Sequence, residues 1–352
     1  MRTLYQTVSA TLDKIDFGAI WLGFQRYHFA LYDETNVYLG EYTFPRDNRF
    51  LGNTAIDYEG DVIAIWNISD PTQEDPQLLA SNIVHEMFHV YQKKHNEKRY
   101  PNDLVMLDYP TAIENYQLKY HENSLLANAY LEKSDFSRRK LLEEFVASRK
   151  CREKMIGHII HQEFLTETIE GLAEFAGCMA LKQLSSKKFD ERILDYISKL
   201  SLLDERIFDI RRNLYFSGAL FFLLLSELKI EFHHCLNDTS IAIFPWLANI
   251  LSTDFPVVYP GNNVLAELYA EHIDSRKKQF KDFLDAHEDA VSMKAFICGY
   301  DPMNMIRMDN MILCSHFIML ENGAMNEPLF LKGPVLVYLK ENSYNEIYSY
   351  AR

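Results

Sequence analysis

The sequence is poor in the residues that mark several common kinds of protein. Only 13 glycines and 11 prolines occur among its 352 residues, which argues against collagen-like, low-complexity and linker-rich architectures. Its five cysteines lie far apart and form no Cys-x-x-Cys pair, so they indicate buried thiols rather than a disulfide framework or a thiolate zinc site. Lysine and arginine total 36 against 50 acidic residues, and the formal net charge of −14 argues against general affinity for nucleic acid.

Long apolar runs are also missing. The longest one extends from Gly218 to Leu225 and is too short to cross a bilayer, so we expect no membrane partner. The first 18 residues include Asp13, Lys14 and Asp16 and lack the apolar core of a signal peptide, which predicts a cytoplasmic protein. By contrast, 48% of the residues are hydrophobic and 13% are aromatic, as in an ordinary globular chain with a sizeable core.

The pattern of polar and apolar residues divides the chain into three regions, 1–72, 73–292 and 293–352. The first region is rich in aromatic and β-branched residues between turn-formers, and it predicts an antiparallel sheet over 15–68. Helical periodicity dominates the second region, and short alternating runs return in the third, which predicts a small β-rich unit. This order of strands, helices and strands indicates an α+β protein. The expected helices span 75–94, 112–132, 135–154, 158–184, 191–203, 211–228 and 264–286, and the expected late strands span 295–300, 312–320, 335–339 and 346–350.

Residues 85–89 read His-Glu-Met-Phe-His, within a helix expected to begin after Asp75. Histidines four apart share a helix face about 6 Å apart along the axis, so His85 and His89 can reach one ion while Glu86 addresses a bound water. Zinc suits neutral imidazoles, and a catalytic zinc takes three protein ligands and leaves a position for water. Glu86 can then accept a proton from that water as it attacks a carbonyl. Chance could also produce the pattern, but its apolar flanks predict a buried helix whose histidines need partners, which favours a metal.

Two residues compete for the position of third ligand. His95 has the spacing of the metzincin pattern His-Glu-x-x-His-x-x-Gly-x-x-His, but Gln92 stands where that pattern has the glycine that turns the chain back. We therefore expect His95 to be solvated at the end of the helix. The alternative lies in a stripe of glutamates whose apolar neighbours predict that Glu170 and Glu174 approach the core, where a zinc site would satisfy them. The stripe consists of Glu163, Glu167, Glu170 and Glu174.

These residues resemble the gluzincin metallopeptidases, in which a glutamate on a later helix completes the zinc site. Residues 170–174, Glu-Gly-Leu-Ala-Glu, are similar to the Glu-x-x-[Ser/Ala]-[Asp/Glu] motif of that group. The resemblance implies that Glu170 is the third ligand and that Glu174 hydrogen-bonds one of the zinc-binding histidines. Residues 213–222 are similar to a helix start in the aminopeptidase branch, which implies that Tyr215 donates a hydrogen bond to the oxyanion. Tyr215 could equally be a core aromatic residue.

The sequence also departs from that group. Eighty residues separate His89 from Glu170, far more than the resemblance implies, so we expect a helical insertion that packs away from the site. The amine-recognition motif of the aminopeptidase branch does not precede His85. By analogy, residues 57–66 are a candidate edge strand for pairing with substrate, although they could also form an interior strand. Arg211 and Arg212 could bind a substrate carboxylate or form a solvated pair.

We therefore predict a cytoplasmic, zinc-dependent peptidase that acts on a peptide or protein substrate. Glu86 is its general base, Tyr215 stabilises the oxyanion, and His85, His89 and Glu170 bind Zn²⁺. Two alternatives stay open from the residues alone. The chain could be a binding or regulatory protein derived from a zincin, or it could hydrolyse non-peptide amides at the same site.

Overall fold

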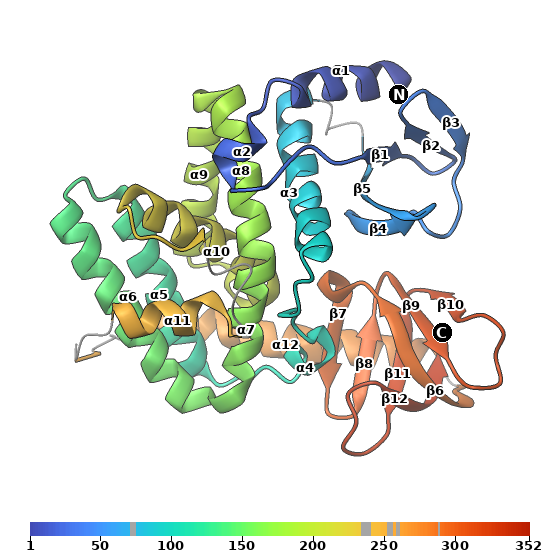
Figure 1. The fold of residues 1–352 in the computed structure, drawn as a ribbon. Coiled ribbons are helices and arrows are strands. Elements are labelled where there is room, and N and C mark those ends of the chain that lie inside the picture. The colour runs from blue at the N-terminus through green and yellow to red at the C-terminus, as the bar shows by residue number, and fades with distance from the viewer. Residues whose placement is uncertain (71–74, 234–240, 252–255, 258–260, 288) are drawn as a thin grey trace.

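The computed structural model describes residues 1–70, 75–233, 241–251, 256–257, 261–287 and 289–352. Figure 1 shows two sheets on one side of the molecule and most of the helices on the other, with helix α3 between the helices and the first sheet. The predicted mixture of helices and sheets is therefore confirmed. The boundary predicted at residue 72 lies outside the described residues, as does Cys235.

The first sheet is mixed, so the prediction of an antiparallel sheet is wrong for one pair of strands. Its order is β3-β2-β1-β5-β4, and β1 pairs with β5 in parallel. The chain leaves the β1-β2-β3 meander at one edge and crosses to β4 at the other edge, so that β5 returns beside β1 in the same direction. Alternating residues predict strands but not their partners. The strands are β1 (Phe29–Tyr32), β2 (Asn36–Leu39), β3 (Tyr42–Pro45), β4 (Thr54–Tyr58) and β5 (Asp61–Asn67).

Two helices that the sequence analysis does not predict precede this sheet, α1 (Arg2–Leu12) and α2 (Phe17–Ile20). Helix α1 buries Tyr5, Val8 and Leu12, and it packs against α3. Its apolar residues follow helical spacing, and this is the signal that could have predicted it.

Helix α3 (Pro76–Lys94) confirms the helix expected after Asp75. The Asp75 carboxylate accepts hydrogen bonds from the backbone N–H groups of Gln77 and Leu78 at 3.0 and 3.1 Å, and Pro76 occupies the first helical position. The helix packs against α8 on one side and β5 on the other, and it is buried over most of its length. His95 caps its end as an exposed residue, as the sequence predicts.

The remaining helices follow the predicted ranges with three differences. Helices α4 and α11 are not predicted, and the helix expected over 158–184 is interrupted by a π-helical turn, Glu167–Gly171. A π-helical turn inserts one residue without an obvious sequence signal, so helical periodicity alone does not locate it. The helices are α4 (Asp103–Met106), α5 (Ile113–Leu131), α6 (Asp135–Ile156), α7 (Ile160–Thr166), α8 (Leu172–Leu184), α9 (Ser186–Ser201), α10 (Ile210–Glu227), α11 (Ile243–Ile250) and α12 (Asn263–Ala286).

The π-helical turn touches helix α10 backbone to backbone. A Cβ atom added to Gly171 would lie 2.7 Å from the Cα atom of Gly218, and one added to Gly218 would lie 2.6 Å from the Cα atom of Gly171. Real side chains do not approach backbone so closely, so glycine is required on both sides of this contact. The contact fixes the position of the segment that carries Glu170 relative to α10.

The stretch between His89 and Glu170 includes helices α5 and α6. Six fully or almost fully buried charged side chains connect these two helices to α7 and the π-helical turn. Helices α5 and α6 supply three cations and one glutamate, and the other two glutamates come from α7 and the π-helical turn. Lys119 lies 2.8 Å from Glu163, and Arg149 contacts Glu167 as well as Glu122. The insertion after His89 therefore does not pack away from the site, as the sequence analysis expects, but supports the segment that leads into Glu170. The six residues are Lys119, Glu122, Arg149, Arg152, Glu163 and Glu167.

We expect Glu163→Gln to destabilise the protein at neutral pH and to weaken its loss of stability in acid. Burial alone would raise the pKa of Glu163, but Arg152 and Lys119 hold that pKa well below the ordinary value of a glutamate. A depressed pKa contributes stability above about pH 4.5, which is lost as the pH falls and the carboxylate is protonated. Removing one partner from a buried ion pair costs about 3–5 kcal/mol.

Urea unfolding of wild type and Glu163→Gln between pH 3 and pH 8 measures both effects. Glu191 is an exposed glutamate in an ion pair with Lys187 on α9, so Glu191→Gln is a matched control that should unfold like wild type. Equal urea midpoints for wild type and Glu163→Gln at pH 7 would contradict the prediction.

The C-terminal residues form a second sheet of entirely antiparallel pairs, which confirms the expected β-rich unit. Its order is β10-β9-β6-β12-β11-β8-β7, and it has its own buried core that includes Ile312, Val335 and Ile347. The run expected as one strand over 312–320 is divided into β8 and β9, and β7 and β10 are not predicted. The strands are β6 (Val291–Tyr300), β7 (Met305–Met308), β8 (Met311–Cys314), β9 (Phe317–Glu321), β10 (Leu329–Lys332), β11 (Val335–Leu339) and β12 (Glu346–Ala351).

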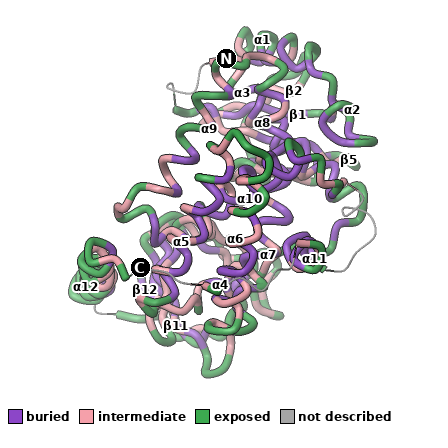
Figure 2. The backbone as a smooth tube through the Cα atoms, turned by 90° about the vertical axis from the view of Figure 1, so that its left-hand side faces the viewer, coloured by how far each residue is buried: buried purple, intermediate pink, exposed green. Residues whose placement is uncertain are grey.

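Figure 2 shows that burial concentrates in α3, α8 and α10, whereas α12 at the edge of the molecule is mostly exposed. Within the described residues, no helix is both long enough and apolar enough to span a membrane.

Candidate metal centre

Three side chains from two distant segments of the chain converge. The Nε2 atoms of His85 and His89 lie 3.1 Å apart, and Glu170 Oε2 lies 3.1 Å from His89 Nε2 and 3.5 Å from His85 Nε2. The histidines come from α3, and Glu170 comes from the π-helical turn before α8. The structure thus brings together the three residues expected as metal ligands, with His95 at the end of the helix instead.

The outer nitrogens of both imidazoles are held by hydrogen-bond acceptors. His85 Nδ1 donates to Glu174 Oε2 at 2.8 Å, and His89 Nδ1 donates to Gln92 Oε1 at 2.8 Å. The amide of Gln92 is oriented by its other end, where Nε2 donates to the carbonyl oxygen of Ile169 at 3.0 Å. When both imidazoles are neutral with Nδ1 protonated, as metal ligands must be, each directs an Nε2 lone pair toward the carboxylate of Glu170. Three acceptors therefore face one another, an arrangement that a cation stabilises.

Glu174 is well placed to keep His85 in this orientation. Its carboxylate also accepts a hydrogen bond from the hydroxyl of Tyr196 and lies 4.0 Å from Arg192. Burial raises the pKa of Glu174, but the hydrogen bond and charge of His85, together with Arg192, lower it to about 2. Glu174 is therefore an ionised acceptor, and its contact with His85 is the one that the family resemblance implies.

The donor set fits zinc in chemistry and in spacing. Two imidazole nitrogens and one carboxylate oxygen are common ligands of catalytic zinc, and donors about 2.0–2.1 Å from a tetrahedral ion lie about 3.3 Å from one another. The three separations here are 3.1, 3.1 and 3.5 Å. The site also attracts positive charge. Burial lowers the pKa of His85, but hydrogen bonds to Glu170 and Glu174 outweigh burial and raise that pKa well above its usual range.

A cavity opens beside the three converging side chains, and His85, His89 and Glu170 all line it. Glu86 follows His85 on α3 and lies in the wall of this cavity. It is only 4% exposed, and its Oε2 atom is buried with no hydrogen-bond partner among the described residues. Burial raises the pKa of this carboxyl group. A buried oxygen without a partner is costly unless a ligand or water hydrogen-bonds to it, so Glu86 marks a position for a bound group beside the three converging side chains.

Tyr215, on α10, lies flat against His85. Their ring centroids are 5.9 Å apart with an angle of 2° between the planes, and the tyrosine hydroxyl accepts a hydrogen bond from Arg211 Nη1 at 3.1 Å. Arg211 is in turn held by an ion pair of 2.9 Å with Asp103. Burial raises the pKa of Tyr215 well above its usual range, so the hydroxyl keeps its proton and can donate it in a hydrogen bond. Tyr215 lines the cavity and is half-buried, unlike a residue packed wholly in the core.

The cavity has a volume of about 590 Å³, and all three parts of the molecule contribute to its wall. The C-terminal sheet supplies two residues that sequence reasoning missed, Asp301 and His316, and Asp301 Oδ2 lies 2.6 Å from His316 Nδ1. The His316 side chain is 55% exposed, so its Nε2 atom is available to a ligand. The two residues are 15 positions apart and follow β6 and β8, so no local motif marks the pair.

The structure decides between the two alternatives given for residues 57–66. Residues 61–66 belong to β5, which lies between β1 and β4, so the segment predicted over 57–66 is largely interior. The edge strand is β4, and Thr54 at its start lines the cavity. Strands β4 and β5 pair as a hairpin and alternate polar and apolar residues in a similar way, so alternation alone does not distinguish the edge strand from its inner neighbour.

Comparisons with protein-family models, with curated proteins and with solved structures found no match. The likeness to gluzincins therefore rests on the residues of this chain alone.

Proposed function

We propose that the protein is a zinc-dependent peptidase with a gluzincin-like site, acting on a peptide or protein substrate in the cytoplasm. The observation that supports this most directly is the convergence of His85, His89 and Glu170 at 3.1–3.5 Å beside the unpartnered carboxylate of Glu86. Histidine, histidine and glutamate are a known set of catalytic zinc ligands, and a nearby carboxylate is the group that a hydrolytic site needs as its base.

In this proposal each residue has a distinct role. His85, His89 and Glu170 hold Zn²⁺, which when bound lowers the pKa of water and polarises the substrate carbonyl. Glu86 accepts the proton of the attacking water and later transfers it to the leaving amine, a role suited to a carboxyl group whose pKa is raised by burial. Tyr215 donates a hydrogen bond to the oxyanion, and Arg211 holds the phenol in place.

The C-terminal sheet adds a second group that can contact substrate. Asp301 accepts a hydrogen bond from His316 Nδ1 and thereby orients the imidazole, which lines the cavity. A neutral histidine oriented in this way can accept a hydrogen bond from a backbone N–H of the substrate. This contact would give the β-rich unit a role in substrate binding.

The cavity is suited to an extended peptide. Its volume of about 590 Å³ accommodates a ligand of a few residues, and the edge strand β4 reaches the wall at Thr54. An extended backbone can pair with such an edge through main-chain hydrogen bonds.

Metal content and peptide hydrolysis, measured together, test the proposal. We expect protein purified without chelators to contain about one zinc per chain and to cleave members of a peptide panel. Chelation should abolish cleavage, and added zinc should restore it. Bound zinc without hydrolysis of any peptide or amide would instead favour a binding protein, and cleavage of small amides alone would favour an amide hydrolase. Cleavage that survives removal of all metal would contradict a zinc mechanism.

A further inference from the structure

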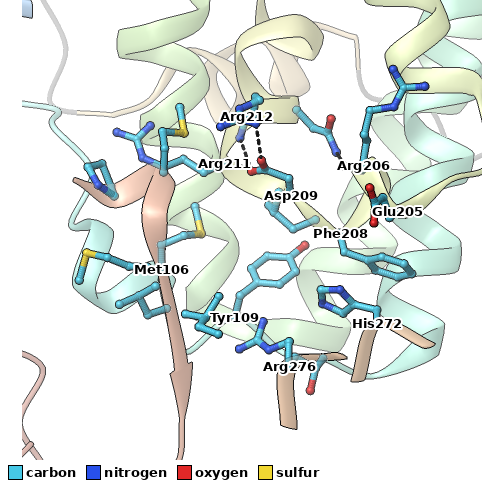
Figure 3. A pocket seen from close by; sticks show the side chains of 18 of the residues that line it. Met106, Tyr109, Glu205, Arg206, Phe208, Asp209, Arg211, Arg212, His272 and Arg276 are labelled. Atoms are coloured by element: carbon cyan, nitrogen blue, oxygen red, sulfur yellow. Dashed lines mark hydrogen bonds and ion pairs between the residues drawn. The ribbon is translucent and has the colours of Figure 1, made fainter. Parts of the chain in front are cut away.

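A second cavity of about 610 Å³ adjoins the metal cavity. Arg211, Pro302 and Met303 line both cavities, so the two spaces lie on either side of these side chains. The second cavity is open to solvent and is lined by the start of α10, the segment around α4, strand β7 and one face of α12 (Figure 3). A ligand that extends from the metal cavity past Arg211 would enter it.

Helix α12 turns a polar face toward this second cavity. His272, Ser275, Arg276 and Gln279 all line it, and their spacing of three, one and three residues places them on one side of the helix. Ser275 and Gln279 are exposed, as polar residues on a helix surface usually are, whereas His272 and Arg276 are partly buried. These two partly buried side chains therefore call for an explanation.

Arg276 differs from the other cations around the cavity. Its Nη2 atom donates to the carbonyl oxygen of Arg307 at 2.6 Å, but no carboxylate among the described residues lies within 4.0 Å of it. Burial lowers the pKa of Arg276, as expected for a cation whose charge is not balanced. Each other cation has an acid partner: Lys199 with Asp195, Arg206 with Asp204, Arg211 with Asp103, Arg212 with Asp209 and Arg307 with Asp108.

His272 lies one turn before Arg276 on α12. Its Nε2 atom is buried and forms no hydrogen bond among the described residues, while its ring stacks on Phe208 with centroids 4.3 Å apart. Burial and Arg276 lower the pKa of His272 to about 4, so the imidazole is neutral near pH 7. A neutral imidazole can offer an N–H group to an acceptor. Arg276 thus has no carboxylate within 4.0 Å among the described residues, although Glu205 also lines the cavity, and an unpartnered polar atom lies one helical turn away (Figure 3).

We propose that the second cavity binds a carboxylate of the peptide whose scissile bond lies in the metal cavity, with Arg276 as its ion-pair partner and His272 as a hydrogen-bond donor. The inference rests on the proposed peptidase function and specifies its substrate class. A guanidinium binds a carboxylate through two parallel hydrogen bonds, which makes arginine well suited to this role. In a chain of net charge −14, an acidic substrate would need a local cation of this kind.

The test compares pools of N-acetylated random hexapeptides built from uncharged residues. One pool ends in an amide, a second ends in a free carboxylate, and a third ends in an amide but contains one glutamate. Each pool is incubated with the zinc-loaded Glu86→Gln protein, and retained peptides are quantified by mass spectrometry. We expect one or both carboxylate pools to be retained about tenfold or more over the neutral pool. The second and third pools distinguish a terminal carboxylate from an acidic side chain.

Variants of the same protein assign the preference to the second cavity. Arg276→Gln should abolish it, and Arg276→Lys should retain part of it, which separates loss of charge from loss of structure. Lys278 is exposed on the same helix and does not line the cavity, so Lys278→Gln is the matched control. Equal retention of all pools, retention of none, or a preference that survives Arg276→Gln would overturn the proposal. Zinc-dependent cleavage of the neutral pool by wild type would leave the peptidase function standing in each case.

Discussion

Replacing Glu86 with glutamine should leave zinc bound and lower peptide hydrolysis by about a thousandfold or more. The amide of glutamine matches the carboxylate in shape, but it cannot accept a proton from water. Because Glu86 Oε2 has no protein partner among the described residues, the substitution should break no hydrogen bond of the fold. Steady-state kcat and zinc content, measured on the same preparation, separate a lost base from a lost metal.

Glu191→Gln is again the control, since it makes the same chemical change at an exposed position on α9. It should retain both wild-type turnover and wild-type zinc content. Undiminished turnover by the zinc-loaded Glu86→Gln variant would refute the role of Glu86 as base.

Removing the third ligand should have the largest effect on metal affinity. With Glu170→Ala, two histidines on one turn of α3 remain, and the convergence of three donor atoms is lost. Glu174→Ala removes only the acceptor from His85 Nδ1, and loss of such an outer partner costs about 10–100-fold in metal affinity. We expect Glu170→Ala to weaken zinc binding by more than Glu174→Ala.

Competition with a fluorescent zinc chelator at fixed pH measures these affinities. Fixing the pH matters because zinc displaces protons from its ligands, and the pKa of His85 is raised by Glu170 and Glu174. An unchanged dissociation constant for Glu170→Ala, or a greater loss for Glu174→Ala, would remove Glu170 from the set of ligands.

The zinc-helix part of the site could be predicted because its signals are local. An aspartate followed by proline sets the start of α3, and two histidines four residues apart share a face of any helix. The nearness of Glu170 to these histidines is not a local signal, because eighty residues separate His89 from Glu170. The apolar neighbours of the glutamate stripe favour Glu170 as the third ligand. Only the tertiary fold, however, places Glu170 Oε2 at 3.1 Å from His89 Nε2.

The features that the sequence does not predict depend on contacts between residues that lie far apart in the sequence. Alternating residues indicate that β1 and β5 are strands, yet their parallel pairing follows from the path of the chain between them. Likewise, His316 and Asp301 gain significance only because the C-terminal sheet meets the metal cavity. The buried pairs of Lys119 with Glu163 and of Arg149 with Glu167 appear in the sequence as ordinary surface charges.

The close approach of Gly171 and Gly218 connects the segment that carries Glu170 to the helix that carries Tyr215. Gly171 follows Glu170 directly, and Gly218 lies one turn after Tyr215 on α10, so the carboxylate and the phenol are tied to two backbones in van der Waals contact. Neither backbone can shift alone without separating Gly171 from Gly218. A methyl group at either glycine should consequently disturb metal retention and oxyanion stabilisation together, even though neither glycine faces the substrate.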